Sequence, residues 1–301
     1  KLLTERCDCV LSPITREKKI AFTGADPFNY PDDDIFGYMK AESKAKAAAK
    51  DKNKEVETTP VAEAVTRISP LKNSTLVSVC SAEIENDFGS MSRGEGNPVP
   101  FEHQFYSTVF KGAFSLDLYH AGRFSTMNKS GYKNLSQDWI EKNKEKIIEL
   151  GAAEENGYWI LPKEERKKRI KDTISVLPYF YGMAKQSGHL TDITPKFIIL
   201  AVMEGGNNPF MSITYEDYGT YQSDLDRSKF INVKALKEVI SDYSNEIISD
   251  IYIGRREGFQ DNISDELEAL KNEFKGEKEI HLLSPKNAVE EFVKIIENHV
   301  E

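Results

Sequence analysis

Two runs of alternating apolar and polar residues constrain the fold of this chain most, because they bracket a long segment that is too polar to be core. The first run covers residues 76–79 and the second covers residues 110–118. Such alternation predicts half-buried β-strands. Between them, residues 83–98 contain three glycines and a proline. We therefore predict an irregular loop over residues 83–98, and loops of this length inside a compact domain are usually functional or disordered.

The predicted loop carries two large apolar side chains, Phe88 and Met91, near its middle. A projecting arm with such residues can wedge between the stacked bases of a nucleic acid. One interpretation is therefore an arm that inserts Phe88 and Met91 between bases. The alternative is a loop whose Phe88 packs back on the body of the protein, and the sequence leaves both open.

Composition excludes a membrane-spanning protein. Hydrophobic residues make up 39% of the chain and charged residues 30%, and no apolar run approaches the ~20 residues that a membrane helix needs. No signal-like segment opens the chain. We expect a cytoplasmic protein with no membrane partner, and we expect a native N-terminal segment ahead of Lys1.

The cysteines do not predict a disulfide framework or a metal site. There are three of them, Cys7, Cys9 and Cys80, which is too few for a disulfide scaffold. The spacing of Cys7 and Cys9 is not that of a structural zinc site, and a second pair of ligands is missing. We expect no metal and no cofactor.

The net charge of −9 is unevenly distributed along the chain. Residues 256–301 hold 12 acidic and 6 basic residues, which leaves a net charge of only −3 on the residues before them. We interpret residues 256–301 as an acidic helical segment with a solvated face. The rest of the chain can still present local cationic surfaces, and these decide whether phosphates bind.

Apolar spacing predicts two helices in the middle of the chain. Residues 162–183 form the strongest pattern, with a kink at Pro178. Basic residues 166–169 near its start are interpreted as a solvated face. A shorter helix is predicted over residues 136–150. The side chains that we expect it to bury are Leu135, Trp139, Ile147 and Leu150.

The last third of the chain predicts a sheet covered by helices. The continuous apolar run at residues 197–203 suits a buried central strand. A helix over residues 233–247 and a strand over residues 250–254 follow, and this order suggests half of a split βαβ unit. An amphipathic helix is predicted over residues 288–300. The fold class predicted from these elements is α+β.

No segment predicts a particular enzyme. Residues Asp32, Asp33 and Asp34 form the only dense carboxylate cluster, and such a cluster can hold a divalent cation. A turn after Pro31 is the simpler interpretation, because neighbouring side chains on a strand point to opposite faces. The sequence contains no P-loop, nucleophile elbow or zinc-protease motif.

Two basic segments could contact phosphates. The loop at residues 185–189 offers Lys185 as a cation and Gln186 as a donor and acceptor for a 2′-hydroxyl, although most such loops are solvated connectors. Residues 40–60 are rich in lysine and alanine without an apolar stripe. We interpret residues 40–60 as a flexible surface excursion.

Taken together, the chain resembles the RNA-binding backbone subunit of CRISPR type I (I-B-like) Cascade complexes, of the DevR type. The resemblance rests on short segments that occur in the order of that family. They are Asp-Ile-Phe-Gly-Tyr-Met (34–39), Arg-Ile-Ser-Pro-Leu (67–71), Glu-His-Gln-Phe-Tyr-Ser-Thr-Val-Phe-Lys-Gly-Ala-Phe-Ser-Leu-Asp-Leu (102–118), Gly-Met-Ala-Lys-Gln (182–186), Thr-Pro-Lys-Phe-Ile-Ile-Leu (194–200) and Asn-Pro-Phe (208–210).

The resemblance implies a single palm domain of the RRM (ferredoxin-like) type over residues 1–301, without its native first strand, and with long insertions. The insertions that it implies are a finger at residues 40–66, a thumb hairpin at residues 77–105 and a helical insertion at residues 128–162.

The resemblance also implies a non-catalytic protein of antiviral defence, which assembles in several copies along a guide RNA. Its implied partners are the guide RNA, target DNA through pairing with the guide, further copies of itself and other Cascade subunits. The RNA-binding residues implied by position are Met39, Phe88, Met91, Lys185 and Gln186. Lys72 and Arg93 are added from their charge alone.

Two alternatives remain. Backbone subunits of type III complexes cut RNA with a metal-dependent aspartate, and Asp32 or Asp34 would have to serve that role here. The other alternative is a free-standing RNA-binding protein, which would remain a monomer.

Overall fold

The computed structural model describes most of the chain. The described residues are 1–17, 20–40, 64–79, 82–91, 97–129, 133–182, 190–215 and 230–301. They form a mixed α and β fold with small sheets and several helices. The coarse fold class predicted from the sequence is therefore confirmed.

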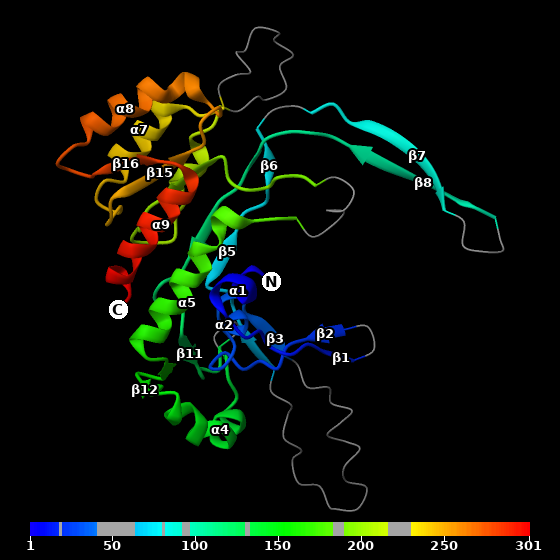
Figure 1. Ribbon diagram of the computed structural model, residues 1–301. Helices are drawn as coiled ribbons and strands as arrows, with labels where there is room; N and C mark the ends of the chain where they lie inside the picture. Colours follow the sequence, from blue (N-terminus) through cyan, green and yellow to red (C-terminus); the bar gives the residue numbers. More distant parts are fainter. Residues whose placement is uncertain are drawn as a thin grey trace, which may run out of the picture.

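A three-stranded sheet organises one end of the molecule (Figure 1). Its order is β14 (Phe197–Leu200), β15 (Ile251–Arg255) and β16 (Ile280–Leu283). β14 is antiparallel to β15, and β15 is parallel to β16. Among the described residues β14 lies at the edge of this sheet, so the prediction of a central strand at residues 197–203 is wrong for the sheet that they form. Its continuous apolar run reflects packing on both faces of the sheet.

Helices cover both faces of this sheet. On one face, α7 (Val233–Asp242) and α8 (Ser264–Glu273) enclose a core with Ile251 and Ile253. On the other face, α9 (Pro285–Ile296) packs over Tyr252, and the rings of Tyr252 and Phe292 are 5.7 Å apart. The predicted amphipathic helix is thus confirmed, beginning three residues earlier. The sheet leaves neither face open for stacking of nucleic-acid bases.

The acidic C-terminal residues are part of this core. Residues 256–301 supply α8, β16 and α9, and their apolar side chains are buried while the acidic ones lie outside. The parallel βαβ unit is formed by β15, α8 and β16. The split unit predicted from residues 197–254 instead joins two antiparallel strands.

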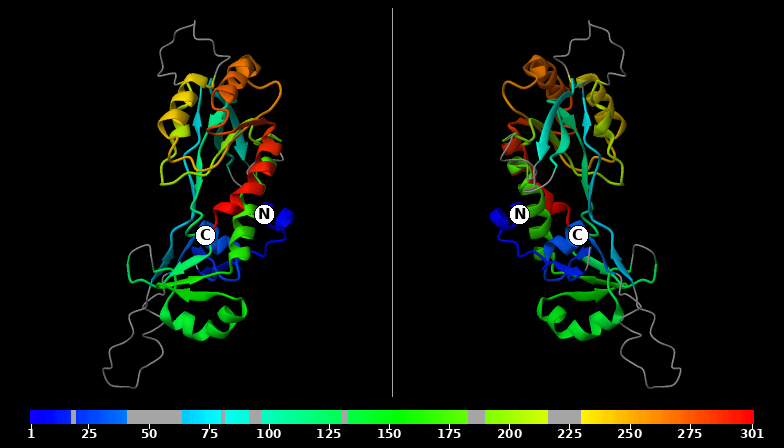
Figure 2. Two further views of the ribbon diagram at one scale, coloured as in Figure 1. Left: turned by 90° about the vertical axis from the view of Figure 1, so that its left-hand side faces the viewer. Right: turned by 90° about the vertical axis from the view of Figure 1, so that its right-hand side faces the viewer.

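The other end of the molecule contains α4 (Gln137–Glu149) and a small antiparallel sheet (Figure 2). The strands of that sheet are β11 (Arg123–Ser125), β13 (Tyr158–Ile160) and β12 (Ala153–Glu155). Leu135 and Ile147 are buried as predicted, and Trp139 is partly buried. Leu150 is 41% exposed, and Ile140 is buried in the core instead.

Helix α5 (Lys163–Ser175) connects the two ends and packs against α9. The predicted helix over residues 162–183 is therefore too long. It gives way to a 3₁₀ turn, η1 (Leu177–Tyr179), because Pro178 has no N–H to continue the helix. Likewise α7 ends at Asp242, five residues before its predicted end.

Short elements complete the body near α5. The helices are α1 (Leu2–Cys7) and α2 (Pro31–Phe36), and the paired strands are β1 (Thr15–Glu17) with β2 (Ile20–Phe22), and β3 (Tyr38–Lys40) with β4 (Val65–Arg67). Further 3₁₀ turns are η2 (Pro209–Ser212), η3 (Asp261–Ile263) and η4 (Glu297–His299). None of the described helices has the length and apolar character needed to cross a membrane.

A long antiparallel ribbon leaves this body (Figure 1). It consists of three successive pairs, namely β5 (Leu71–Asn73) with β10 (Phe114–Leu116), β6 (Val77–Ser78) with β9 (Phe110–Lys111), and β7 (Glu85–Met91) with β8 (Val99–Phe105). The register shifts between pairs, so the outgoing strand has extra residues that bend the ribbon.

The ribbon confirms strand structure within both runs that bracket the predicted loop. The irregular loop itself is a wrong prediction, because residues 85–91 and 99–105 are paired strands. Cross-strand backbone hydrogen bonds offset the weak strand preference of Gly89 and Pro100.

Candidate nucleic-acid interface

The outer part of the ribbon projects away from the body (Figure 1). We call its described residues, 82–91 and 97–105, the arm. In an antiparallel pair, residues directly opposite each other lie on the same face, and successive residues of a strand alternate between faces. The register of β7 and β8 therefore assigns every side chain of the arm to one of two faces.

One face of the arm carries most of its aromatic side chains, with the carboxylates Glu85 and Asp87 opposite Phe105 and His103. Met91 lies opposite Val99 on this face, and Gly89 lies opposite Phe101. The ring of Phe101 covers Gly89, since a Cβ atom there would lie 2.5 Å from Phe101 Cζ. Phe101 also contacts His103 edge to face, with ring centroids 4.7 Å apart. These side chains form a continuous stripe that ends at Phe105.

The other face presents Phe88 alone among polar neighbours. Phe88 is 76% exposed and lies opposite Glu102. Phe88 and Met91 are three positions apart on one strand, so they point to opposite faces of the arm. The interpretation of Phe88 and Met91 as residues that insert between bases stays a prediction, and each of them can contact only what lies on its own side of the arm. The alternative, in which Phe88 packs back on the body, is also wrong.

The arm is negatively charged. Its described residues include four carboxylates and no lysine or arginine; the carboxylates are Glu83, Glu85, Asp87 and Glu102. Such a surface repels phosphates, and the side chains in its described part that are suited to stacking on bases are the apolar and aromatic ones.

The remaining predicted contact residues lie apart from the arm or outside the described residues. Met39 is 71% exposed in the middle of β3, and Lys72 is exposed in β5 opposite Ser115. Met39 belongs to the body, and Lys72 lies at the base of the ribbon. Arg93, Lys185 and Gln186 lie outside the described residues, as does most of the lysine- and alanine-rich stretch at 40–60.

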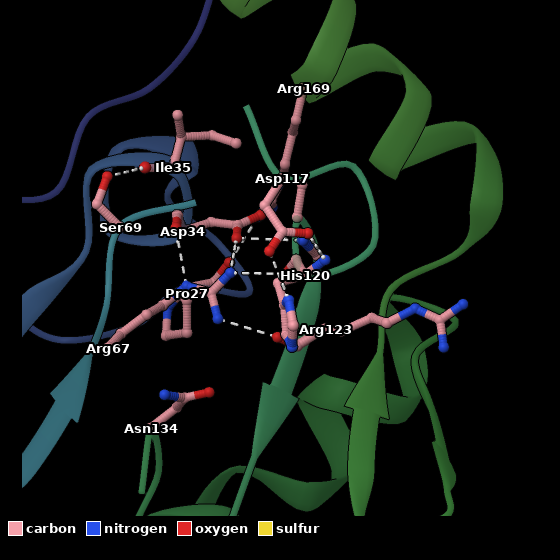
Figure 3. A network of polar contacts seen from close by, with 12 residues as sticks. Pro27, Asp34, Ile35, Arg67, Ser69, Asp117, His120, Arg123, Asn134 and Arg169 are labelled. Carbon is pink, nitrogen blue, oxygen red and sulfur yellow. Dashed lines mark hydrogen bonds and ion pairs between the residues drawn. The ribbon is translucent and has the colours of Figure 1, made fainter. Parts of the chain in front are cut away.

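A buried ionic network joins the base of the ribbon to the body (Figure 3). Asp34 of α2 is fully buried and bonds two arginines, Arg67 of β4 and Arg169 of α5. The distance from Arg169 Nη1 to Asp34 Oδ2 is 2.9 Å. Arg169 also donates to two backbone carbonyls, those of Pro27 and Phe28. Three segments far apart in the sequence therefore meet at one carboxylate.

Arg67 extends the network to the turn that follows the ribbon. It donates to the carbonyls of His120 and Arg123, each at 2.9 Å, and its guanidinium lies 4.7 Å from the centroid of the Phe124 ring. The N–H of Gly122 donates to Asp34 Oδ1 at 3.1 Å. The turn at residues 117–122 is thereby held in one position relative to α2 and α5.

These contacts change the interpretation of two predicted segments. Residues 31–36 form a helix and not a turn or strand, and both carboxylate oxygens of Asp34 form ion pairs with arginines. Asp32 accepts the N–H of Ser12 at 2.9 Å. In the described part of the chain, no group of three metal-ligating side chains comes together. The basic residues 166–169 are not simply a solvated face, because Arg166 and Arg169 are buried.

Sequence reasoning missed the aromatic stripe of the arm and the turn at residues 117–122. The stripe had a signal, since Val99, Phe101, His103 and Phe105 alternate with polar or small residues at the period of a strand. The turn had no such signal in the sequence. Arg67 and Arg166, which donate to its carbonyls, lie 53 and 45 residues away from their partners along the chain.

A known protein family matches most of the chain. Residues 12–223 match the model of a family described as CRISPR-associated negative auto-regulator DevR/Csa2. The match includes α2, the ribbon, α4, α5 and β14, and it stops before α7. It spans 212 of the 301 residues, and the chain therefore belongs to the DevR/Csa2 family. The family match confirms the resemblance to a type I-B-like Cascade protein. No curated protein matches the chain.

Proposed function

We propose that the chain is a non-catalytic backbone subunit of a type I-B Cascade complex. Several copies assemble along a CRISPR guide RNA in the cytoplasm and present it for pairing with target DNA. The sheet of β14, β15 and β16 with its helices serves as the RRM-like palm, and the arm serves as the thumb. Membership of the DevR/Csa2 family supports this role.

The observation that carries the proposal is the arm with an exposed apolar side chain on each face. Phe88 is on one face and Met91 on the other, so one arm can touch bases on both of its sides. The exposed apolar side chains of the arm are suited to contact with bases, whereas its carboxylates repel phosphates. The arm can therefore set where the guide bends without providing the main affinity for RNA.

The mass of the protein with and without guide RNA tests the assembly. Light scattering should show a monomer or small oligomer alone and a particle with several copies per RNA after reconstitution. A particle with one copy per RNA would favour the free-standing RNA-binding protein. Cleavage of labelled complementary RNA in Mg²⁺ would favour the ribonuclease, although burial of Asp34 between Arg67 and Arg169 argues against that alternative.

Substitution of Phe88 tests the role of the arm. Phe88→Ser should leave RNA binding largely intact, because stacking on one aromatic ring is worth about 1–3 kcal/mol per base. The regular pattern of exposed nucleotides along the guide, read by 2′-hydroxyl acylation, should disappear. Ile148→Ser, at an exposed apolar position of α4, is the matched control and should keep the pattern. An unchanged pattern in Phe88→Ser would remove Phe88 from the contact with bases.

A further inference from the structure

Three buried arginines, Arg67, Arg166 and Arg169, lie on the inner side of the turn at residues 117–122. Asp34 forms ion pairs with Arg67 and Arg169, and Glu165 also pairs with Arg169 at 2.8 Å. Arg166, a third buried arginine, donates to backbone carbonyls, including Ala121 at 2.8 Å and Leu118 at 3.0 Å. These carbonyls and an oxygen of Glu301 accept from its N–H groups. The inner side of the turn therefore lies in a region rich in buried arginines.

A fourth arginine, Arg123, extends this region to the surface. Burial lowers the pKa of Arg166, and repulsion from Arg123 lowers it further, against the opposing effects of Asp34 and Glu301. In Figure 3 the Arg123 side chain points away from the Asp34 network. Its Nε is buried and donates to no acceptor in the part of the chain that the structure describes.

Arg123 is held beside an exposed aromatic ring and a histidine. Its guanidinium lies 4.3 Å from the ring centroid of Tyr119, which is 46% exposed. The ring of His120 contacts Tyr119 edge to face, with centroids 5.0 Å apart. The Asp117 carboxylate lies 2.7 Å from His120 Nδ1 and fixes the imidazole orientation.

The geometry points to a phosphate-binding site formed by Tyr119, His120 and Arg123, and, resting on the proposed function, we propose that its ligand is a backbone phosphate of the guide RNA. A guanidinium matches two phosphate oxygens through its N–H donors. The nucleotide attached to that phosphate lies beside the exposed ring of Tyr119. The turn brings the cations that the acidic arm lacks.

The preorganisation of the turn distinguishes this cluster from an ordinary surface pair of arginine and tyrosine. Arg166 and Asp34 bond its backbone from below, and Asp117 accepts the N–H of His120 at 3.0 Å. Little side-chain or backbone freedom therefore remains to be lost when a phosphate binds. Contact with a phosphate carries no base preference, so the site should bind RNA of any sequence.

Anisotropy of a labelled single-stranded RNA, measured over a range of salt concentrations, tests the site. Arg123→Gln should weaken binding about tenfold, as expected for a lost charge-assisted hydrogen bond, and reduce the salt slope by about 0.7. Lys144→Gln, at an exposed lysine of α4, should change neither quantity. Equal behaviour of the two variants, with unchanged thermal melting, would overturn the proposal.

Modification of Arg123 by phenylglyoxal, read by mass spectrometry of its peptide, separates this proposal from the proposed function. Protection by RNA alone supports a backbone phosphate site, and equal protection by inorganic phosphate supports a general phosphate site. If RNA binds without protecting Arg123, the site is wrong while the RNA-binding function stands. If phosphate protects Arg123 but no RNA binds, the function is wrong while the site stands. Stronger protection by an acidic peptide than by RNA would overturn the phosphate assignment.

Discussion

Replacement of Asp34 should show how strongly the body depends on one buried charge. The side chain of Asp34 is fully buried and bonds Arg67, Arg169 and the N–H of Gly122. Asp34→Asn keeps the size of the side chain but removes its charge. Arg67 then loses its carboxylate partner and Arg169 keeps only Glu165, and an amide must donate where the carboxylate only accepted.

The expected loss is large. Removal of one partner from a buried ion pair costs about 3–5 kcal/mol. With a shift of about 2 °C per kcal/mol for a protein of this size, the melting temperature should fall by about 6–10 °C. The loss should be mainly electrostatic, because the substitution creates almost no cavity.

Circular dichroism during thermal melting measures the effect. Glu141→Gln, which neutralises an exposed carboxylate on α4, is the control and should melt within about 1 °C of the unmodified protein. The combined Asp34→Asn and Arg169→Met variant should lose less stability than the sum of its parts, because the two side chains are direct partners and their interaction is counted in both single variants. A change below 2 °C in Asp34→Asn would refute the assigned role of Asp34.

Three further predictions follow from individual side chains. Gly122→Ala should cost at least about 2 kcal/mol, because its φ is +72° and the new methyl group meets the Arg166 side chain; Gly157→Ala, at φ +79° with nothing within 4 Å, should cost less in the same denaturant titration. Burial, reinforced by the charge of Asp172, raises the pKa of Cys9 to about 11. Alkylation of Cys9, measured on its peptide, should therefore be slow at pH 8 and become faster as the pH rises towards 11. Rapid alkylation at pH 7 would contradict this. Burial alone would raise the pKa of Asp117, but hydrogen bonds from His120 outweigh it and the pKa lies below the usual 3.8. The stability that Asp117 contributes should therefore be present above pH 3.8 and disappear as the pH falls through its lower folded pKa, measured as a shrinking difference in melting temperature between the protein and Asp117→Asn.

Helices α4 and α9 could be predicted from the sequence, because the spacing of apolar residues that produces them is a local property. Helix α9 has apolar residues at helical spacing, so Ala288, Val289 and Phe292 are buried as expected. Helix α4 follows in the same way from its spacing, and Ser136 caps its first turn. The order of short motifs also sufficed to predict the family, which the match over residues 12–223 bears out.

Tertiary contacts decided what local patterns could not. The burial of Arg169 depends on Asp34, which lies 135 residues earlier in the chain, and no local pattern reports such a partner. The position of β14 at the sheet edge depends on which strands pair with it. Helix ends were also missed, because backbone contacts after Ser175 and Asp242 favour turns over a further helical turn.

The arm shows most directly which features follow from the sequence and which follow only from the tertiary structure. The sequence alone determined that residues 76–118 contain strands at both ends and two large apolar side chains, Phe88 and Met91, between them. Only pairing in three dimensions decided that these side chains lie on opposite faces and that Phe101 covers Gly89. The reason is that alternation along a strand is a local property, whereas register is set by the partner strand.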